Sequence, residues 1–272
     1  MALRINTNVE AIQIHGKLVD TSNALANSLK KLSTGKRINS AKDDAAGFNV
    51  ANKFRSDISS MRVAYQNASE GQSMLAVADG AYNKVHDILV RMKDLATQAA
   101  SGQTPQAPLQ SEFQLLQSEI DRIANSTKYN TTDLIKADSN VTFQVGQSND
   151  ANFQLTIAMK GSTATLLGVS TSVKVDSAGN AQTAMMNLDT ALSSINAFMS
   201  TVGAYQNRLQ YTMENLSVSI ENFTASESTI RDVDMAFEVT QFTKNQILQQ
   251  SGMAMLAQAN TAPQQVLTLL RG

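Results

Sequence analysis

Side chains that commonly carry catalysis or bind metal ions are scarce in this sequence. It contains no cysteine and only two histidines, His15 and His86, which fall in different predicted helices. The absence of cysteine excludes thiol catalysis, disulfides and cysteine-ligated metal sites. The His-Glu-x-x-His pattern of zinc proteases does not occur either. We therefore predict that the chain is not an enzyme and uses no cofactor and no metal ion.

Two short motifs resemble ligand-binding loops but are incomplete. Gly35-Lys36 lacks the upstream glycine and the following hydroxyl residue of a phosphate-binding loop. Asp232-x-Asp234 lacks the glycine and the distal glutamate of a calcium loop. Acidic residues in such positions more often cap a helix, and this is the interpretation we prefer.

The composition favours contact with other protein over contact with nucleic acid or lipid. Charged residues make up 17% of the 272 residues, against about 25% in a typical soluble chain, whereas asparagine and glutamine number 22 each. The net charge of −1 lacks the basic excess of a nucleic-acid-binding protein. No apolar run approaches the roughly 18 residues of a membrane span, and the N-terminus lacks the pattern of a cleavable signal.

Apolar residues recur at alternating steps of four and three, which is the heptad pattern of packed helices. Three long seams follow this pattern and predict helices over 41–101, 106–127 and 182–224. The positions of the seams are Ala78, Tyr82, Val85, Leu89, Met92, Ala96 and Ala99; Leu109, Phe113, Leu116, Ile120 and Ile123; and Leu188, Leu192, Ile195, Met199, Val202, Gln206, Leu209, Met213, Leu216, Ile220 and Phe223.

The segment 128–180 changes character. Val141–Val145 and Phe153–Ile157 alternate apolar and polar residues on either side of Gly146–Asp150, which is rich in turn formers. This pattern predicts one β-hairpin, with a second small β or loop region near Leu166 to Val175.

Helix boundaries are predicted from capping residues. Gly35 can end a first helix in the left-handed conformation. Ser40 and Asp43 form the spacing of a capping box that would begin the long helix, and Thr229 and Asp232 form another before the C-terminal helix.

The terminal helices have narrow, alanine-rich apolar stripes that bury little area by themselves. The C-terminal stripe includes Leu248, Met255, Ala259, Ala262 and Val266. Because isolated helices of this kind are marginal in water, we hypothesise that both ends are disordered in the monomer and fold against each other and against neighbouring copies.

These patterns together predict a mostly α fold. It would be an elongated antiparallel coiled-coil or helical-bundle rod with a small β-hairpin region, and its terminal helices would pair with each other. The predicted domains are an N-terminal helix at 1–40, a rod domain at 41–228 and a C-terminal helix at 229–272.

Two motifs at opposite ends of the chain resemble bacterial flagellin. The first is SLKKLSTGKRINSAKDDAAG at residues 28–47. The second comprises IRDVDMA at 230–236, FTK at 242–244, MLAQAN at 255–260 and PQQVLTLL at 263–270. The resemblance covers about 1–125 and 180–272, and the variable outer domain of large flagellins is reduced to the hairpin region.

The resemblance implies a structural subunit that polymerises into the flagellar filament, the motility propeller, outside the bacterial cell. It also implies that the terminal helices pair into a filament core, with residues 1–40 as the N-terminal core helix and spoke and 229–272 as the C-terminal core helix. It implies unfolded export through the flagellar type III apparatus, the export chaperone FliS, and filament cap and junction proteins as partners. A hook–filament junction protein is the alternative. A secreted enzyme on a coiled-coil stalk is disfavoured, because the non-helical region lacks paired carboxylates, a nucleophile or metal ligands.

The resemblance also implies two host-receptor sites. Arg91, Leu95, Gln98 and Glu112 match the positions of the family's Toll-like receptor 5 epitope, although Leu95 could instead pack in the core. Leu267, Leu269 and Leu270 match leucines that the family presents to cytosolic NAIP receptors, and they would also pack in the filament core.

Overall fold

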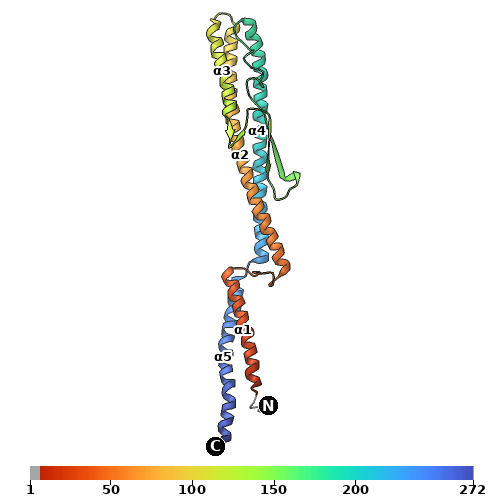
Figure 1. Ribbon diagram of the computed structural model, residues 1–272, viewed down its shortest axis with the longest axis vertical. Helices are drawn as coiled ribbons and strands as arrows, with labels where there is room; N and C mark the ends of the chain where they lie inside the picture. Colours follow the sequence, from red (N-terminus) through yellow and green to blue (C-terminus); the bar gives the residue numbers. More distant parts are fainter. Residues whose placement is uncertain (1–6, 272) are drawn as a thin grey trace. The chain divides into compact units, whose positions relative to one another are not determined.

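The structure is a computed structural model that describes residues 7–271, with side-chain environments through Thr261. Within these residues it contains five α-helices and two antiparallel strand pairs (Figure 1). The helices are α1 (Val9–Thr34), α2 (Ala45–Ala100), α3 (Gln106–Ser126), α4 (Ala178–Arg231) and α5 (Met235–Arg271). The strands are β1 (Lys128–Tyr129), β2 (Thr132–Asp133), β3 (Ser139–Gln144) and β4 (Gln154–Met159). The predicted mostly α fold with a small β-hairpin region is confirmed, and none of the described helices meets the length and hydropathy of a membrane span.

The chain divides into two compact units. The bundle unit comprises residues 57–221, and the terminal-helix unit comprises residues 1–56 and 222–272. The division falls inside α2 and α4. The three domains predicted from the sequence, 1–40, 41–228 and 229–272, have boundaries drawn from motifs, whereas the two units are defined by compactness. The three-domain division stays a prediction.

The bundle unit has one hydrophobic core, to which α2, α3, α4 and the β3–β4 hairpin all contribute side chains. The predicted seams occupy this core. All seven seam positions of α2 are buried, as are Phe113 and Ile120 of α3 and Leu188 and Ile195 of α4. The steps of four and three therefore identified the packed helix faces correctly.

The predicted hairpin is confirmed. Strands β3 and β4 pair antiparallel, with Phe143 opposite Leu155. The connection between them contains the Gly146–Asp150 segment and a short 3-10 helix at Ala151–Phe153. A smaller pair, β1–β2, was missed because two-residue strands show no alternation. The segment from Leu166 to Val175 is a loop, one of the two forms that the sequence left open.

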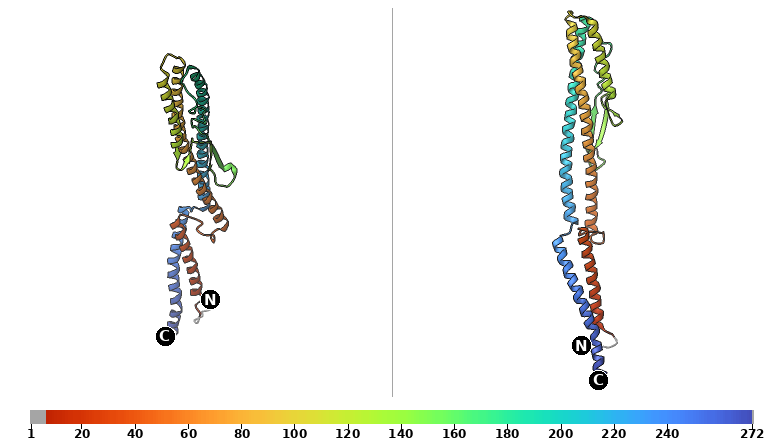
Figure 2. Two further views of the ribbon diagram at one scale, coloured as in Figure 1. Left: turned by 45° about the horizontal axis from the view of Figure 1, so that its top comes forward. Right: turned by 90° about the vertical axis from the view of Figure 1, so that its left-hand side faces the viewer.

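In the terminal-helix unit, α1 and α5 lie side by side in both views of Figure 2. Helix α1 ends as predicted, because Gly35 adopts the left-handed conformation with φ of 68°.

The predicted start of the long helix at Ser40 is wrong. The Asp43 carboxylate accepts hydrogen bonds from the backbone N–H groups of Asn39 and Ser40, at 3.0 and 2.9 Å, which closes a turn before the helix. Helix α2 begins at Ala45, and the Asp44 carboxylate accepts from the Gly47 N–H at 2.9 Å. With two successive aspartates, one folds back onto the turn and the next caps the helix.

The predicted cap at Thr229 is also wrong. Helix α4 starts at Ala178, earlier than predicted, and continues past 224 to Arg231, since no glycine or proline interrupts residues 204–231. The Thr229 hydroxyl donates to the Ala225 carbonyl inside the helix. Helix α5 is capped instead by Asp234, which accepts from the Phe237 N–H at 3.1 Å.

Candidate assembly surface

Helix α5 packs on α1 through one face. The described positions of α5 that are not exposed are Glu238, Gln241, Phe242, Asn245, Gln249, Gly252, Leu256 and Ala259, which follow steps of four and three apart from Gln241. A Cβ atom on Gly252 would lie 3.2 Å from the Cδ1 atom of Leu18, so glycine at this position allows close approach of the two helices. The Asn8 side chain donates to the Ala259 carbonyl at 2.8 Å. This seam is polar and small, and it buries few large apolar groups.

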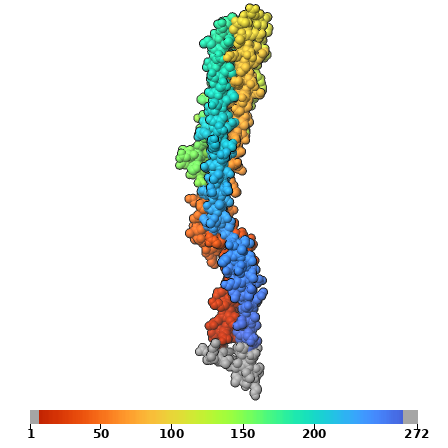
Figure 3. All heavy atoms as spheres, turned by 180° about the vertical axis from the view of Figure 1, so that it is seen from behind, coloured from red at the N-terminus to blue at the C-terminus, as the bar shows by residue number. Residues whose placement is uncertain are grey.

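Large apolar side chains of the same two helices remain exposed. They are Val9, Ile12, Val19 and Leu29 on α1 and Met235, Phe237, Val239, Ile247, Leu248, Met253 and Met255 on α5. Figure 3 shows α5 in blue next to α1 in red. We call these eleven residues the terminal apolar surface. Apolar exposure this dense marks a contact surface for protein or membrane.

A groove of about 840 Å³ runs along the edge of the α1–α5 pair. Its apolar lining includes Ile14, Leu18, Leu248 and Met255. Gly16 also lines the groove, where a Cβ atom would meet no other atom within 4 Å. Polar residues, among them Lys17, Asp20 and Ser251, complete the lining, so the groove is apolar only in part.

The predicted C-terminal seam is divided by these observations. Ala259 packs against α1, whereas Leu248 and Met255 are 48% and 58% exposed and line the groove. These two side chains are therefore only partly covered within the described part of the terminal-helix unit. Ala262, Val266, Leu267, Leu269 and Leu270 lie in α5, but their side chains are outside the described residues.

A backbone connection between the end of α1 and the α4–α5 junction was missed by the sequence interpretation. The Arg37 N–H donates to the Arg231 carbonyl at 2.7 Å, and the Val233 N–H donates to the Gly35 carbonyl at 3.1 Å. The buried Arg231 guanidinium donates to the Ile38 carbonyl at 3.3 Å and lies over the Phe48 ring at 5.7 Å. These contacts fix where the two terminal helices begin and end.

The predicted receptor face lies on α2 and α3 of the bundle unit. The Arg91 guanidinium donates twice to one Glu112 carboxylate oxygen, at 2.9 and 2.7 Å, and both side chains are partly exposed. Gln98 is exposed on the same helix as Arg91. Leu95 is buried in the core, which is the alternative that the sequence left open.

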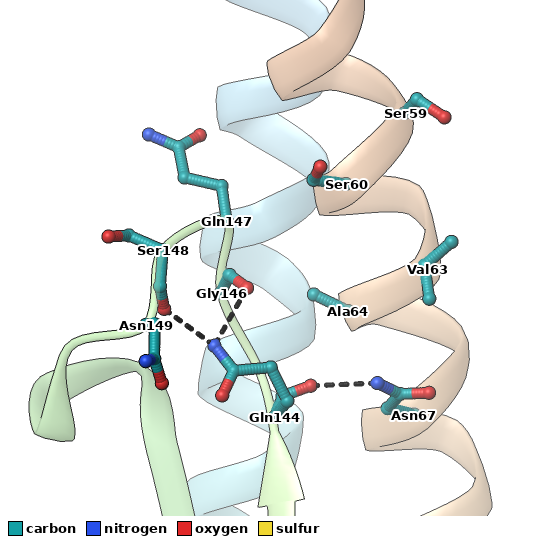
Figure 4. A pocket seen from close by; sticks show the side chains of 10 residues that line it. All are labelled: Ser59, Ser60, Val63, Ala64, Asn67, Gln144, Gly146, Gln147, Ser148 and Asn149. Atoms are coloured by element: carbon teal, nitrogen blue, oxygen red, sulfur yellow. Dashed lines mark hydrogen bonds between the residues drawn. The ribbon is translucent and has the colours of Figure 1, made fainter.

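The bundle unit also holds a polar cleft of about 410 Å³ between α2 and the tip of the hairpin (Figure 4). The Asn67 side chain donates to the Gln144 carbonyl at 2.9 Å, and the Gln144 amide donates to the Ser148 carbonyl at 2.7 Å. None of its ten lining residues is titratable. The cleft therefore offers hydrogen bonds but no acid–base group, and its contacts hold the tip against α2.

One buried titratable group has a strongly shifted pKa. Burial raises the pKa of Tyr82 to about 12, and the hydroxyl donates to the Lys160 carbonyl at 2.5 Å. A neutral tyrosine that fastens α2 to the end of β4 is a structural group. In the described part of the chain, no three His, Cys, Asp or Glu side chains gather as metal ligands.

The sequence is similar to flagellins along nearly its whole length. The family model described as bacterial flagellin N-terminal helical region matches residues 5–140, and the model described as bacterial flagellin C-terminal helical region matches residues 185–270. A flagellin from Halalkalibacterium halodurans is 40% identical over 271 residues, covering 98% of this chain and 99% of the relative. A flagellin from Bacillus subtilis is 37% identical, covering 99% and 100%.

A solved structure described as a flagellar hook-associated protein, from Vibrio parahaemolyticus, has a TM-score of 0.58 over 70% of this chain and 100% of its own. At 12% identity this likeness shows a shared fold alone. The family models and the full-length relatives show that the chain belongs to the bacterial flagellin family, as a structural subunit of the flagellar filament.

Proposed function

We propose that this flagellin polymerises through the terminal apolar surface, with Leu248 and Met255 at the centre of the contact between copies. The observation that carries the proposal is the contrast in burial. Among buried apolar residues of the described side chains, only Ile38, Ala51 and Ala259 belong to the terminal-helix unit. Eleven large apolar side chains of α1 and α5 are exposed, so the terminal helices depend on a partner to bury them.

The free energy available from such burial favours assembly. Full burial of one fully exposed valine, leucine or methionine side chain contributes about 1.5–3 kcal/mol, and the side chains of the terminal apolar surface are between 45% and 66% exposed. Burial of the remaining area of these eleven side chains is comparable with the cost of immobilising a subunit, which is about 4–15 kcal/mol. A second copy presents the same terminal apolar surface, and the two surfaces can bury each other.

The test is a charge placed in the groove. We expect Leu248→Asp combined with Met255→Asp to abolish polymerisation of the purified chain, because each subunit contact would bury two carboxylates. Met186→Asp is the matched control, since Met186 is 72% exposed in the bundle unit, and it should still polymerise. Electron microscopy and sedimentation measure the outcome. Filaments formed by the double variant at the normal rate would refute the assignment of this surface.

Partial disorder of the terminal helices before assembly belongs to the same proposal. A pair that buries few apolar groups is easily opened. We expect circular dichroism to show less helix in the monomer than in the polymer, and equal helix content would contradict this.

Opened terminal helices would suit unfolded export and capture by the chaperone FliS, followed by an extracellular role between junction and cap proteins. The same electron micrographs separate this role from the junction alternative, because a junction protein forms no long filaments.

Host recognition is a second candidate function, favoured by the accessible Arg91–Glu112 pair. We propose that Arg91, Gln98 and Glu112 form a polar contact for Toll-like receptor 5, with buried Leu95 supporting the helix beneath it. The variant Arg91→Ala should lower receptor binding in a surface plasmon resonance measurement while filaments still form. For NAIP receptors the corresponding change is Leu269→Ala together with Leu270→Ala.

The structural role of the family makes catalysis unnecessary, and we propose that the chain is not an enzyme.

A further inference from the structure

We propose that Met253 and Met255 are oxidation sites, and that their conversion to methionine sulfoxide by a peroxide stops the unassembled chain from polymerising. This inference rests on the proposed function, because it places both sulfurs at the contact between copies. It adds a covalent modification and the class of oxidant that makes it.

The methionines of the chain fall into two groups. Met61, Met74, Met92 and Met159 are buried in the bundle unit, and Met185, Met199 and Met213 are partly buried there. Among the described side chains, Met186, Met235, Met253 and Met255 are exposed. Three of these four therefore belong to α5, the helix with the largest unpartnered apolar face.

Met253 and Met255 lie on the two flanks of the face that packs on α1. Residues two apart on an α-helix are separated by about 200° around the axis, and the packed positions Gly252 and Leu256 fall between the two directions. Met255 lines the groove beside Leu248, and Met253 is 51% exposed on the other flank. Oxidation at either position leaves the α1–α5 seam intact.

The reaction needs no catalytic group in the protein. A lone pair of the thioether sulfur attacks one peroxide oxygen, the O–O bond breaks, and an S–O bond forms. The sulfur loses two electrons, and the proton on the attacked oxygen passes to the departing hydroxide, so that hydrogen peroxide is reduced to water. The flexible apolar side chain becomes polar and chiral.

Where apolar side chains of a neighbouring copy cover it, a sulfoxide oxygen loses water without gaining a hydrogen-bond donor from that copy. The cost of such an unsatisfied group corresponds to a change of about 5- to 150-fold in an equilibrium constant. In a finished filament the same sulfurs are covered by the neighbouring copy. Peroxide should therefore act on free subunits and spare assembled ones.

The experiment treats the purified full-length chain with hydrogen peroxide, once as monomer and once as filament. Peptide mass spectrometry locates the added oxygens, and circular dichroism confirms that the bundle unit stays folded. Polymerisation is then followed by sedimentation and electron microscopy. Methionine sulfoxide reductases A and B, added afterwards, should restore assembly because they return both sulfoxide epimers to the thioether.

The matched variants are Met253→Leu with Met255→Leu, which keeps the apolar volume, and Met186→Leu, which removes an exposed methionine of the bundle unit. We expect peroxide to slow polymerisation of the native chain and of Met186→Leu by at least about fivefold, and to leave the double leucine variant unaffected. Single variants with reductase rescue decide the question if the double variant assembles poorly before treatment.

Three results would overturn the inference. The oxidised native chain could polymerise at the untreated rate, the double leucine variant could be inhibited as strongly as the native chain, or Met253 and Met255 could stay unoxidised while Met186 reacts. Failure of the proposed function has a different signature. In that case the untreated chain forms no filaments, or Leu248→Asp with Met255→Asp polymerises normally.

Discussion

The two units of this flagellin are built from similar helices but differ in how far they bury their apolar side chains. In the bundle unit, α2, α3 and α4 turn their heptad positions toward one another, and the core closes within the chain. In the terminal-helix unit, the contact face of α5 includes only two large apolar residues, Phe242 and Leu256, and seven others of this helix are exposed. The comparison shows that a heptad seam indicates packing without indicating whether the partner is in the same chain.

A pair of phenylalanines gives the largest expected effect. Phe113 is fully buried in the bundle unit, whereas Phe237 in α5 is 62% exposed. Phe113→Ala removes a ring from a closed core and should lower the free energy of unfolding by about 3–5 kcal/mol. Phe237→Ala should change it by less than about 0.5 kcal/mol.

Urea denaturation of the monomer, followed by far-ultraviolet circular dichroism, measures the free energy of unfolding of both variants. The difference between them would disappear if the terminal-helix unit had a closed core of its own. A large loss of stability for Phe237→Ala would therefore contradict the contrast between the units.

Tyr82 should make the bundle unit sensitive to alkali. Burial raises its folded-state pKa to about 12, above the usual value of 10.0. The neutral phenol is therefore favoured by folding, and its contribution is complete below pH 10 and is lost as the pH rises from 10 toward 12. One pKa unit corresponds to 1.36 kcal/mol, so the loss is about 2–3 kcal/mol at the upper end of this range.

The control for this pH dependence is Tyr82→Phe, which cannot ionise. Its stability should fall less steeply above pH 10 than that of the native chain, in the same urea titration. Equal slopes for the two proteins would show that Tyr82 does not titrate in this window.

Gln117 should have the next largest effect on the free energy of unfolding, because its side chain holds a loop of the bundle unit. Its buried side-chain amide donates to the carbonyls of Val169, Ser170 and Val173, at 3.1, 2.8 and 3.1 Å. Gln117→Ala leaves these carbonyls without that donor and should lower the free energy of unfolding by about 1–3 kcal/mol.

Gln114 is the control for Gln117, since it is exposed on the same helix, and Gln114→Ala should be nearly neutral. Hydrogen exchange of the loop amides reports the local effect. Unchanged protection in Gln117→Ala would mean that the loop is held by its apolar residues alone.

The sequence predicted the parts of the fold that repeat and missed the parts that occur once. The seams identified the buried faces of α2, α3 and α4, and alternation identified β3 and β4. Gln117 and Arg231 were not predicted, because a side chain that satisfies backbone groups more than fifty residues away leaves no local pattern. The misplaced caps have a similar cause, since adjacent acidic residues compete for the same N–H groups and only the folded turn selects one.

The same reasoning applies to the candidate assembly surface. Heptad spacing grouped Leu248, Met255 and Ala259 into one seam, but spacing does not reveal that Ala259 faces α1 while Leu248 and Met255 line an open groove. The division depends on how closely Gly252 lets α5 approach Leu18. That approach is a tertiary contact, which periodicity alone does not specify.

The smallest expected effect concerns the Arg91–Glu112 pair. Although its geometry is good, with the shorter contact at 2.7 Å, both side chains are about half exposed. Exposed ion pairs contribute less than about 1 kcal/mol, because solvent screens them and two long side chains lose freedom. A double-mutant cycle with Arg91→Ala and Glu112→Ala should therefore give a small coupling energy that falls further in high salt. A large, salt-independent coupling would mean that this face stabilises the bundle unit, and Arg91→Ala would then no longer separate receptor contact from folding.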